Sequence, residues 1–233
     1  MKKFLKITGL VLGIGILFLL VFGWIKSEPL PNGKSGIEAD ALANKMLAAL
    51  NIEAYKNTRF LEWSFRNEAN RFIWDKELGI CSVKWEDYEV SLDLTNPNQS
   101  MAAKNGVSLT TEEKDKIINK ALEYFNNDSF WLAAPYKVFD KGTERSIVEL
   151  EDGSQGLLIT YTSGGDTPGD SYLWILNENG FPNSYKMWVK VIPIGGIEAS
   201  WDDWVVAESG AFLPKTHEFG PINLDMGNVR GYN

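Results

Sequence analysis

The stretch Phe60-Leu61-Glu62-Trp63-Ser64-Phe65 alternates apolar and polar side chains from Leu61 onward. A period of two is typical of a β-strand with one buried face. The alternation returns in residues 80–85 and 88–94, with turn-forming residues between the runs. Four further strands are predicted, at residues 145–150, 156–162, 172–176 and 185–192. Short strands joined by short turns predict antiparallel meanders, and Asn177-Glu178-Asn179-Gly180 has the composition of a hairpin turn.

Two amphipathic helices interrupt this β pattern. In residues 37–51, Leu42, Met46 and Leu50 recur at every fourth position, as on one face of a helix. A second helix is expected after Thr110, which forms a capping box with Glu113, and before Asn126-Asn127-Asp128, where we expect it to break. Meander, helix, meander predicts an α+β fold without repeating β-α-β units.

The order of these elements resembles a known family. The segments that carry the likeness are Phe72-Ile73-Trp74-Asp75, Trp131-Leu132-Ala133-Ala134-Pro135, residues 172–182, Trp201-Asp202-Asp203-Trp204 and Gly210-Ala211-Phe212-Leu213-Pro214. This layout, over residues 37–233, is similar to the lipoprotein-carrier superfamily of outer-membrane lipoprotein sorting proteins. The likeness implies a strongly curved antiparallel sheet, an incomplete β-barrel, covered by helices, with acyl chains bound in the apolar cavity between them.

A nearer resemblance is to an uncharacterised family of membrane-tethered proteins of Bacteroidetes-type bacteria. It rests on Tyr161-Thr162-Ser163-Gly164-Gly165 and Pro168-Gly169-Asp170-Ser171-Tyr172. Soluble carriers shuttle their cargo, whereas a tethered protein of this kind stays at one membrane.

Large aromatic side chains on the predicted strands are the candidates for lining such a cavity. They are Trp63, Phe72, Trp74, Trp85, Trp131, Trp174 and Trp188. The alternatives are that these rings only fill a close-packed core, or that they provide stacking platforms for sugars.

Residues 7–25 (ITGLVLGIGILFLLVFGWI) form a run of nineteen residues without a charge. As a helix this run would reach roughly 28 Å, close to the ~30 Å of a bilayer's hydrocarbon core. The lysines at positions 2, 3 and 6 favour a cytoplasmic amino terminus. We therefore expect a single-pass signal anchor over residues 1–26, a proline- and glycine-rich tether over residues 27–36, and an extracytoplasmic domain over residues 37–233. The competing interpretation, a cleaved secretory signal, delivers the domain to the same compartment, the periplasmic side of the inner membrane.

Composition excludes several classes of function. The part beyond the anchor has 19 basic and 31 acidic residues, a formal charge of −12 that disfavours binding to nucleic acid. The single cysteine, Cys81, allows no internal disulfide and no lipid attachment after the apolar run, and we expect its side chain to be buried. One histidine, His217, cannot build a multi-histidine metal site, and its polar surroundings predict a surface or turn residue. We expect no metal, no cofactor and no catalytic residue.

These observations favour a non-catalytic binding protein for an apolar or lipid-like ligand. One alternative is a carbohydrate-active enzyme or glycan-binding protein. Its acid-base candidates are Glu62, Asp75, Glu86, Asp87, Asp202 and Asp203. A second alternative is an envelope scaffold whose partner is another protein.

Overall fold

A computed structural model describes residues 26–110, 112–163 and 167–233. The expected span over residues 7–25 lies outside these residues. None of the helices in the described part combines the length and the apolar composition needed to cross a bilayer.

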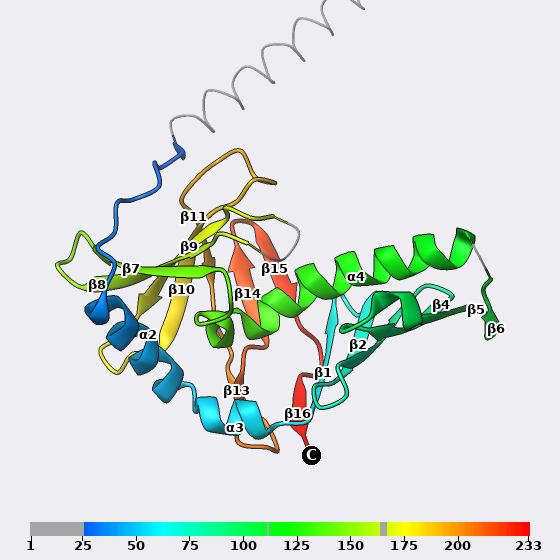
Figure 1. Cartoon of the computed structure of the whole chain (residues 1–233). Helices are drawn as coiled ribbons and strands as arrows, with labels where there is room; N and C mark the ends of the chain where they lie inside the picture. The colour runs from blue at the N-terminus through cyan, green and yellow to red at the C-terminus, as the bar shows by residue number, and fades with distance from the viewer. Residues whose placement is uncertain (1–25, 111, 164–166) are drawn as a thin grey trace, which may run out of the picture.

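The described strands form two antiparallel seven-stranded sheets and one small ribbon (Figure 1). The first sheet has the order β16-β1-β2-β3-β4-β5-β6. Its strands are β1 (Phe60–Phe65), β2 (Asn70–Asp75), β3 (Ile80–Trp85), β4 (Tyr88–Asp93), β5 (Met101–Lys104), β6 (Val107–Ser108) and β16 (Arg230–Tyr232).

The second sheet has the order β15-β14-β11-β10-β9-β8-β7. Its strands are β7 (Thr143–Glu149), β8 (Gln155–Tyr161), β9 (Ser171–Leu176), β10 (Pro182–Trp188), β11 (Ile197–Ser200), β14 (Thr216–Phe219) and β15 (Ile222–Asp225). The ribbon pairs β12 (Val205–Val206) with β13 (Phe212–Leu213).

The alternation in the sequence is realised in the burial of the strands. On β1, Leu61, Trp63 and Phe65 are buried while Glu62 faces solvent in part, although Ser64 on the polar face is buried as well. On β3, Cys81, Val83 and Trp85 are buried in the same way, so the prediction for Cys81 is confirmed. Gly180 takes a positive φ of 89° in the turn between β9 and β10, which confirms the predicted hairpin.

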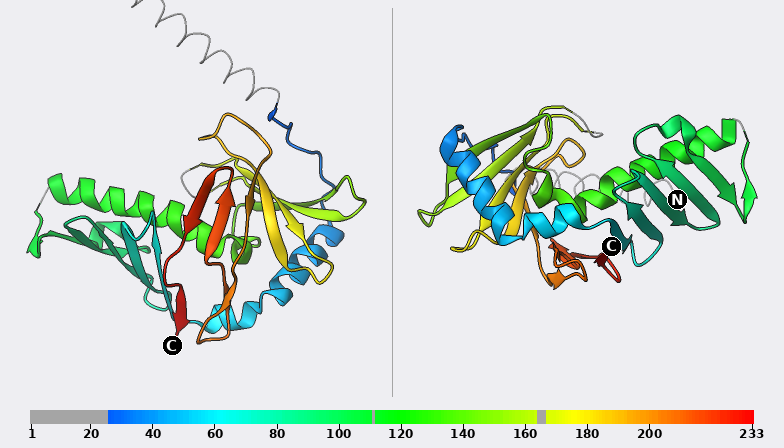
Figure 2. Two further views of the ribbon diagram at one scale, coloured as in Figure 1. Left: turned by 180° about the vertical axis from the view of Figure 1, so that it is seen from behind. Right: turned by 60° about the horizontal axis from the view of Figure 1, so that its bottom comes forward.

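The helices cover the sheets at two places. Helix α2 (Ile37–Ala49), followed by α3 (Ile52–Asn57), packs against β7 of the second sheet. The 22-residue helix α4 (Glu112–Ala133) lies with its first half over β4 and β5 and extends toward the second sheet (Figures 1 and 2). Two 3-10 turns complete the helical elements, η1 (Pro97–Gln99) and η2 (Ala134–Lys137).

The α+β class is confirmed, but the prediction of one strongly curved sheet, an incomplete β-barrel, is wrong for the described residues. Two open sheets are present instead, because β6 and β7 each end a sheet and the chain between them forms α4. Alternation in a sequence shows which residues form strands but not which strands pair, so it could not separate one sheet from two.

The predicted break of the second helix at Asn126-Asn127-Asp128 is also wrong, because α4 continues through these residues to Ala133. Asp128 is fully buried, and its carboxylate accepts hydrogen bonds of 2.8 Å from the amides of Asn70 and Asn127. This tertiary contact offsets the weak helix propensity of the three residues. The capping box at Thr110 includes residue 111, which lies outside the description.

We expect Asn70→Ala to lower the free energy of unfolding by about 1.5–3 kcal/mol, because it leaves the buried Asp128 carboxylate without its donor from β2. Asn119→Ala, at an exposed position of the same helix, is the matched control and should leave stability unchanged or slightly raised. Urea unfolding of both variants measures the difference. Equal stabilities would show that the Asn70–Asp128 contact does not hold α4 on the first sheet.

Candidate functional site

A groove of about 640 Å³ runs along the carboxyl-terminal half of α4, between this helix and strands β8, β9 and β10. We call it the α4 groove. Its wall toward the second sheet is aromatic and apolar, formed by Phe130, Trp131, Tyr161, Tyr172, Tyr185 and Met187.

The aromatic rings of this wall pack against one another. Phe130 lies 4.8 Å from Tyr172 and 5.6 Å from Tyr161 between ring centroids, and Tyr172 lies 5.1 Å from Tyr185. Trp131 closes the series at 5.8 Å from Tyr185. Contacts at these distances, most of them tilted or edge-on, hold the rings in place. The groove therefore has a preformed apolar surface.

Hydroxyl groups are the polar component of this wall. The Tyr161 hydroxyl is buried, and within the described residues it has no hydrogen-bond partner. Burial, reinforced by the neighbouring Tyr172, raises the pKa of Tyr161 far above the usual range of a phenol. Burial likewise raises the pKa of Tyr172. Both side chains are neutral donors at physiological pH, so the wall is free of charge.

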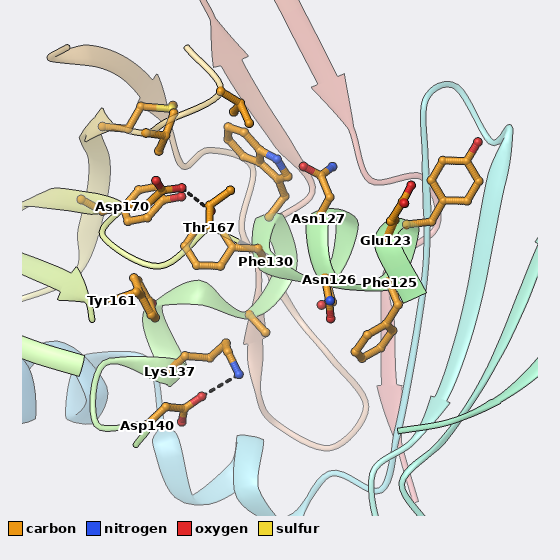
Figure 3. Close-up of a pocket in the computed structure, with 18 of the residues that line it drawn as sticks. Glu123, Phe125, Asn126, Asn127, Phe130, Lys137, Asp140, Tyr161, Thr167 and Asp170 are labelled. Atoms are coloured by element: carbon orange, nitrogen blue, oxygen red, sulfur yellow. Dashed lines mark hydrogen bonds and ion pairs between the residues drawn. The ribbon is translucent and has the colours of Figure 1, made fainter. Parts of the chain in front are cut away.

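Several of the charged groups that line the groove are engaged with neighbours (Figure 3). Lys137 and Asp140 form an ion pair of 2.6 Å, and Lys120 and Glu123 form one of 2.8 Å. At the other end, Asp170 accepts hydrogen bonds from the Thr167 hydroxyl and from a backbone amide 3.0 Å away. Figure 3 shows Phe130 and Tyr161 between the Thr167–Asp170 and Lys137–Asp140 pairs. The arrangement suits burial of an apolar group more than proton transfer.

The structure brings only two of the seven candidate cavity residues, Trp74 and Trp131, into this groove. Trp85 and Trp174 are buried in the core. Trp63 and Phe72, also buried, stack at 4.7 Å and border a smaller hollow of about 290 Å³ on the first sheet. Trp188, on β10, donates its indole N–H to the backbone oxygen of Glu28 at 2.8 Å.

Sequence reasoning missed Phe130, Tyr161, Tyr172, Tyr185 and Met187. The period of two contained a usable signal, because Tyr185 and Met187 share one face of β10 while Trp188 must face the other. Choosing candidates by ring size alone selected Trp188 and passed over its neighbour.

The six carboxylates considered for glycan chemistry do not line the α4 groove. Glu62 borders the smaller hollow, and Asp75 is held by Arg59 in an ion pair of 2.8 Å. Among the described residues, no group of three or more histidine, cysteine or acidic side chains is placed to hold a metal ion.

The prediction that His217 is a surface or turn residue is wrong. His217 lies on β14 with 0% of its surface exposed, between Trp131 and Trp201 at 5.2 and 4.6 Å from their ring centroids. Its Nδ1 donates to the Ser200 carbonyl at 2.9 Å. Burial lowers the pKa of His217 to about 4, and the backbone hydrogen bonds oppose this shift. The residue is a neutral part of the core beside the groove.

Comparison with known protein families finds no match to this chain. A search of curated proteins finds no matching relative either.

We expect the protein to lose stability as the pH falls from about 6.5 to about 4, because the unfolded state protonates its histidine in that range while folded His217 stays neutral. The loss from this one group is about 3 kcal/mol across the window. Urea unfolding at several pH values should give a shallower dependence for His217→Asn, which does not titrate there. Parallel curves for the two proteins would contradict the assignment.

Proposed function

We propose that this protein is a membrane-anchored, extracytoplasmic binding protein that holds an apolar or lipid-like ligand in the α4 groove, without covalent chemistry. The observation that carries the proposal is the preformed aromatic wall between α4 and the second sheet. Binding would take place by removal of the ligand's apolar surface from water.

The size of the groove is consistent with this function. Sites for small molecules commonly enclose ≈ 300–1,000 Å³, and the α4 groove measures about 640 Å³. An acyl chain of ten methylenes removed from water gains on the order of 8 kcal/mol before the costs of association. This gain is enough for useful affinity without any charged contact.

The half-barrel implied by the resemblance to lipoprotein carriers is absent from the described residues, so the resemblance supports only the class of ligand. In that family acyl chains lie between a sheet and its covering helices, and the α4 groove likewise lies between a helix and a sheet. The anchor over residues 7–25 and the periplasmic location are part of this proposal, and they rest on the uncharged run and its flanking lysines.

Binding of a glycan is less well supported. Sugar sites need polar side chains that are available to hydroxyl groups, whereas Glu123, Asp140 and Asp170 are each held by a neighbouring side chain. The Phe130–Tyr161 and Tyr172–Tyr185 pairs of the wall also pack edge-on, so these rings do not form a flat stacking platform for a sugar.

The test measures binding of a fluorescent single-chain fatty acid, such as dansyl-undecanoic acid, to the full-length protein in nanodiscs. Phe130→Ala removes part of the wall and should weaken binding about tenfold, which corresponds to 1.4 kcal/mol and to roughly half of the transfer energy of a phenylalanine side chain. Empty nanodiscs give the background.

Phe139→Ala is the matched control, because Phe139 is 42% exposed and does not line the groove. It should leave the affinity for the probe unchanged. Equal affinities for the two variants and the parent protein would contradict the proposal. Saturable binding of a soluble oligosaccharide in place of the fatty acid would favour the glycan alternative.

A further inference from the structure

Ser27 and Glu28, near the start of the described chain, form hydrogen bonds with the loop that follows β10. The Gly195 amide donates to the Ser27 hydroxyl at 3.0 Å, and the Glu28 amide donates to the Gly195 carbonyl at 2.9 Å. Lys186 forms an ion pair of 2.8 Å with the Glu28 carboxylate. Segment 27–28 thus has a fixed position on the second sheet.

The same loop, residues 189–196 (VKVIPIGG), is mostly apolar, and Lys190, Val191 and Pro193 in it are exposed. We call it the β10–β11 loop. Val191 keeps 74% of its surface accessible, which among the large apolar side chains of the described residues is exceeded by Ile37 alone. The loop contains one lysine and no acidic residue, in a domain whose formal charge is −12. This loop is therefore better suited to contact with a bilayer than the acidic surface of the rest of the domain.

The β10–β11 loop also forms part of the lining of the α4 groove, through Val189, Val191 and Ile192. Figure 1 shows this loop, in the gold part of the colour range, at the end of the molecule where the described chain begins. The β12–β13 ribbon and α3 lie at the opposite end. Part of the groove lining and the start of the described chain therefore lie at the same end of the molecule.

Chain length sets how far this end can be from the membrane. Ser27 is two positions after Ile25, the last of the uncharged run, and an extended chain advances at most ~3.6 Å per residue. A span ending at Ile25 would therefore leave the hydrocarbon core within roughly 7 Å of the Ser27 hydroxyl, which contacts the loop.

We infer that the β10–β11 loop contacts the bilayer, and that the α4 groove opens at the membrane surface to take its ligand from the adjoining leaflet. The inference rests on the proposed function and on the anchor. It specifies a membrane-resident, single-chain amphiphile as the ligand class, because such a molecule can slide into the groove without crossing water. The partner that covers the exposed loop is the lipid surface. The test distinguishes this partner from a second copy of the chain.

The first experiment measures the depth of the loop. The full-length protein carries Pro193→Cys with an environment-sensitive dye, in phosphatidylcholine vesicles with brominated acyl chains. Buried Cys81 should not take up the dye, because burial raises the pKa of its thiol. Val206→Cys, at a side chain that is 63% exposed on β12, is the matched control at the far end of the molecule.

Bromine quenching of the dye at residue 193, with none at residue 206, is the expected result. Equal emission with and without bromine at both positions would overturn the inference. A blue-shifted dye at residue 193 that bromine does not quench would also overturn it, since this result indicates contact with a second copy.

The second experiment separates the route of entry from binding itself. Pro193→Asp places a charge on the loop at a residue outside the groove lining, and Val206→Asp is its control. Uptake of the fatty-acid probe is followed from vesicles and, separately, from a water-soluble cyclodextrin complex. Pro193→Asp should slow uptake from vesicles severalfold and leave the affinity measured from cyclodextrin unchanged. Equal rates of uptake from vesicles for both variants would refute entry from the membrane but not the proposed function. Absence of probe binding from both vesicles and cyclodextrin would refute the proposed function.

Discussion

The structure depends on one apolar core that two open sheets share. Trp63 of the first sheet and Trp174 of the second are buried in the same continuous cluster of side chains. Neither sheet closes on itself, so each must cover its apolar face with elements from elsewhere in the chain. Helix α4 covers part of the apolar face. The carboxyl-terminal strands connect the two sheets, because β15 belongs to the second sheet and β16 to the first.

The groove is a consequence of this arrangement. The first half of α4 is seated on β4 and β5, and the buried contact between Asp128 and Asn70 fixes the helix at its middle. Beyond that point the helix continues toward the second sheet, where Trp131 meets Tyr185 and His217. Between the two contacts the side chains of helix and sheet do not fill the space, and the α4 groove remains. The hydrogen bonds of Ser27 and Glu28 then orient this groove relative to the start of the chain.

Much of the local structure followed from the sequence. The strands around Trp63, Cys81 and Tyr172 and the turn before Gly180 lie where alternation and turn composition predicted them. The helix through Asn126-Asn127-Asp128 did not follow, because local propensity favours a break there. A buried hydrogen bond to a residue 58 positions away reverses that preference, and such a contact leaves no trace in a local pattern.

The sequence by itself determined the class of the fold, the approximate positions of seven of the sixteen strands in the described part, the acidity of the domain and the burial of Cys81, since these depend on composition and on periods of two or 3.6 residues. Only the tertiary structure decided that the strands divide into two sheets and that His217 is buried. It also decided which rings are exposed to a ligand and which are covered. The physical reason is that pairing between strands and packing between layers join residues far apart in the chain, and their geometry is set by the whole fold rather than by any local pattern.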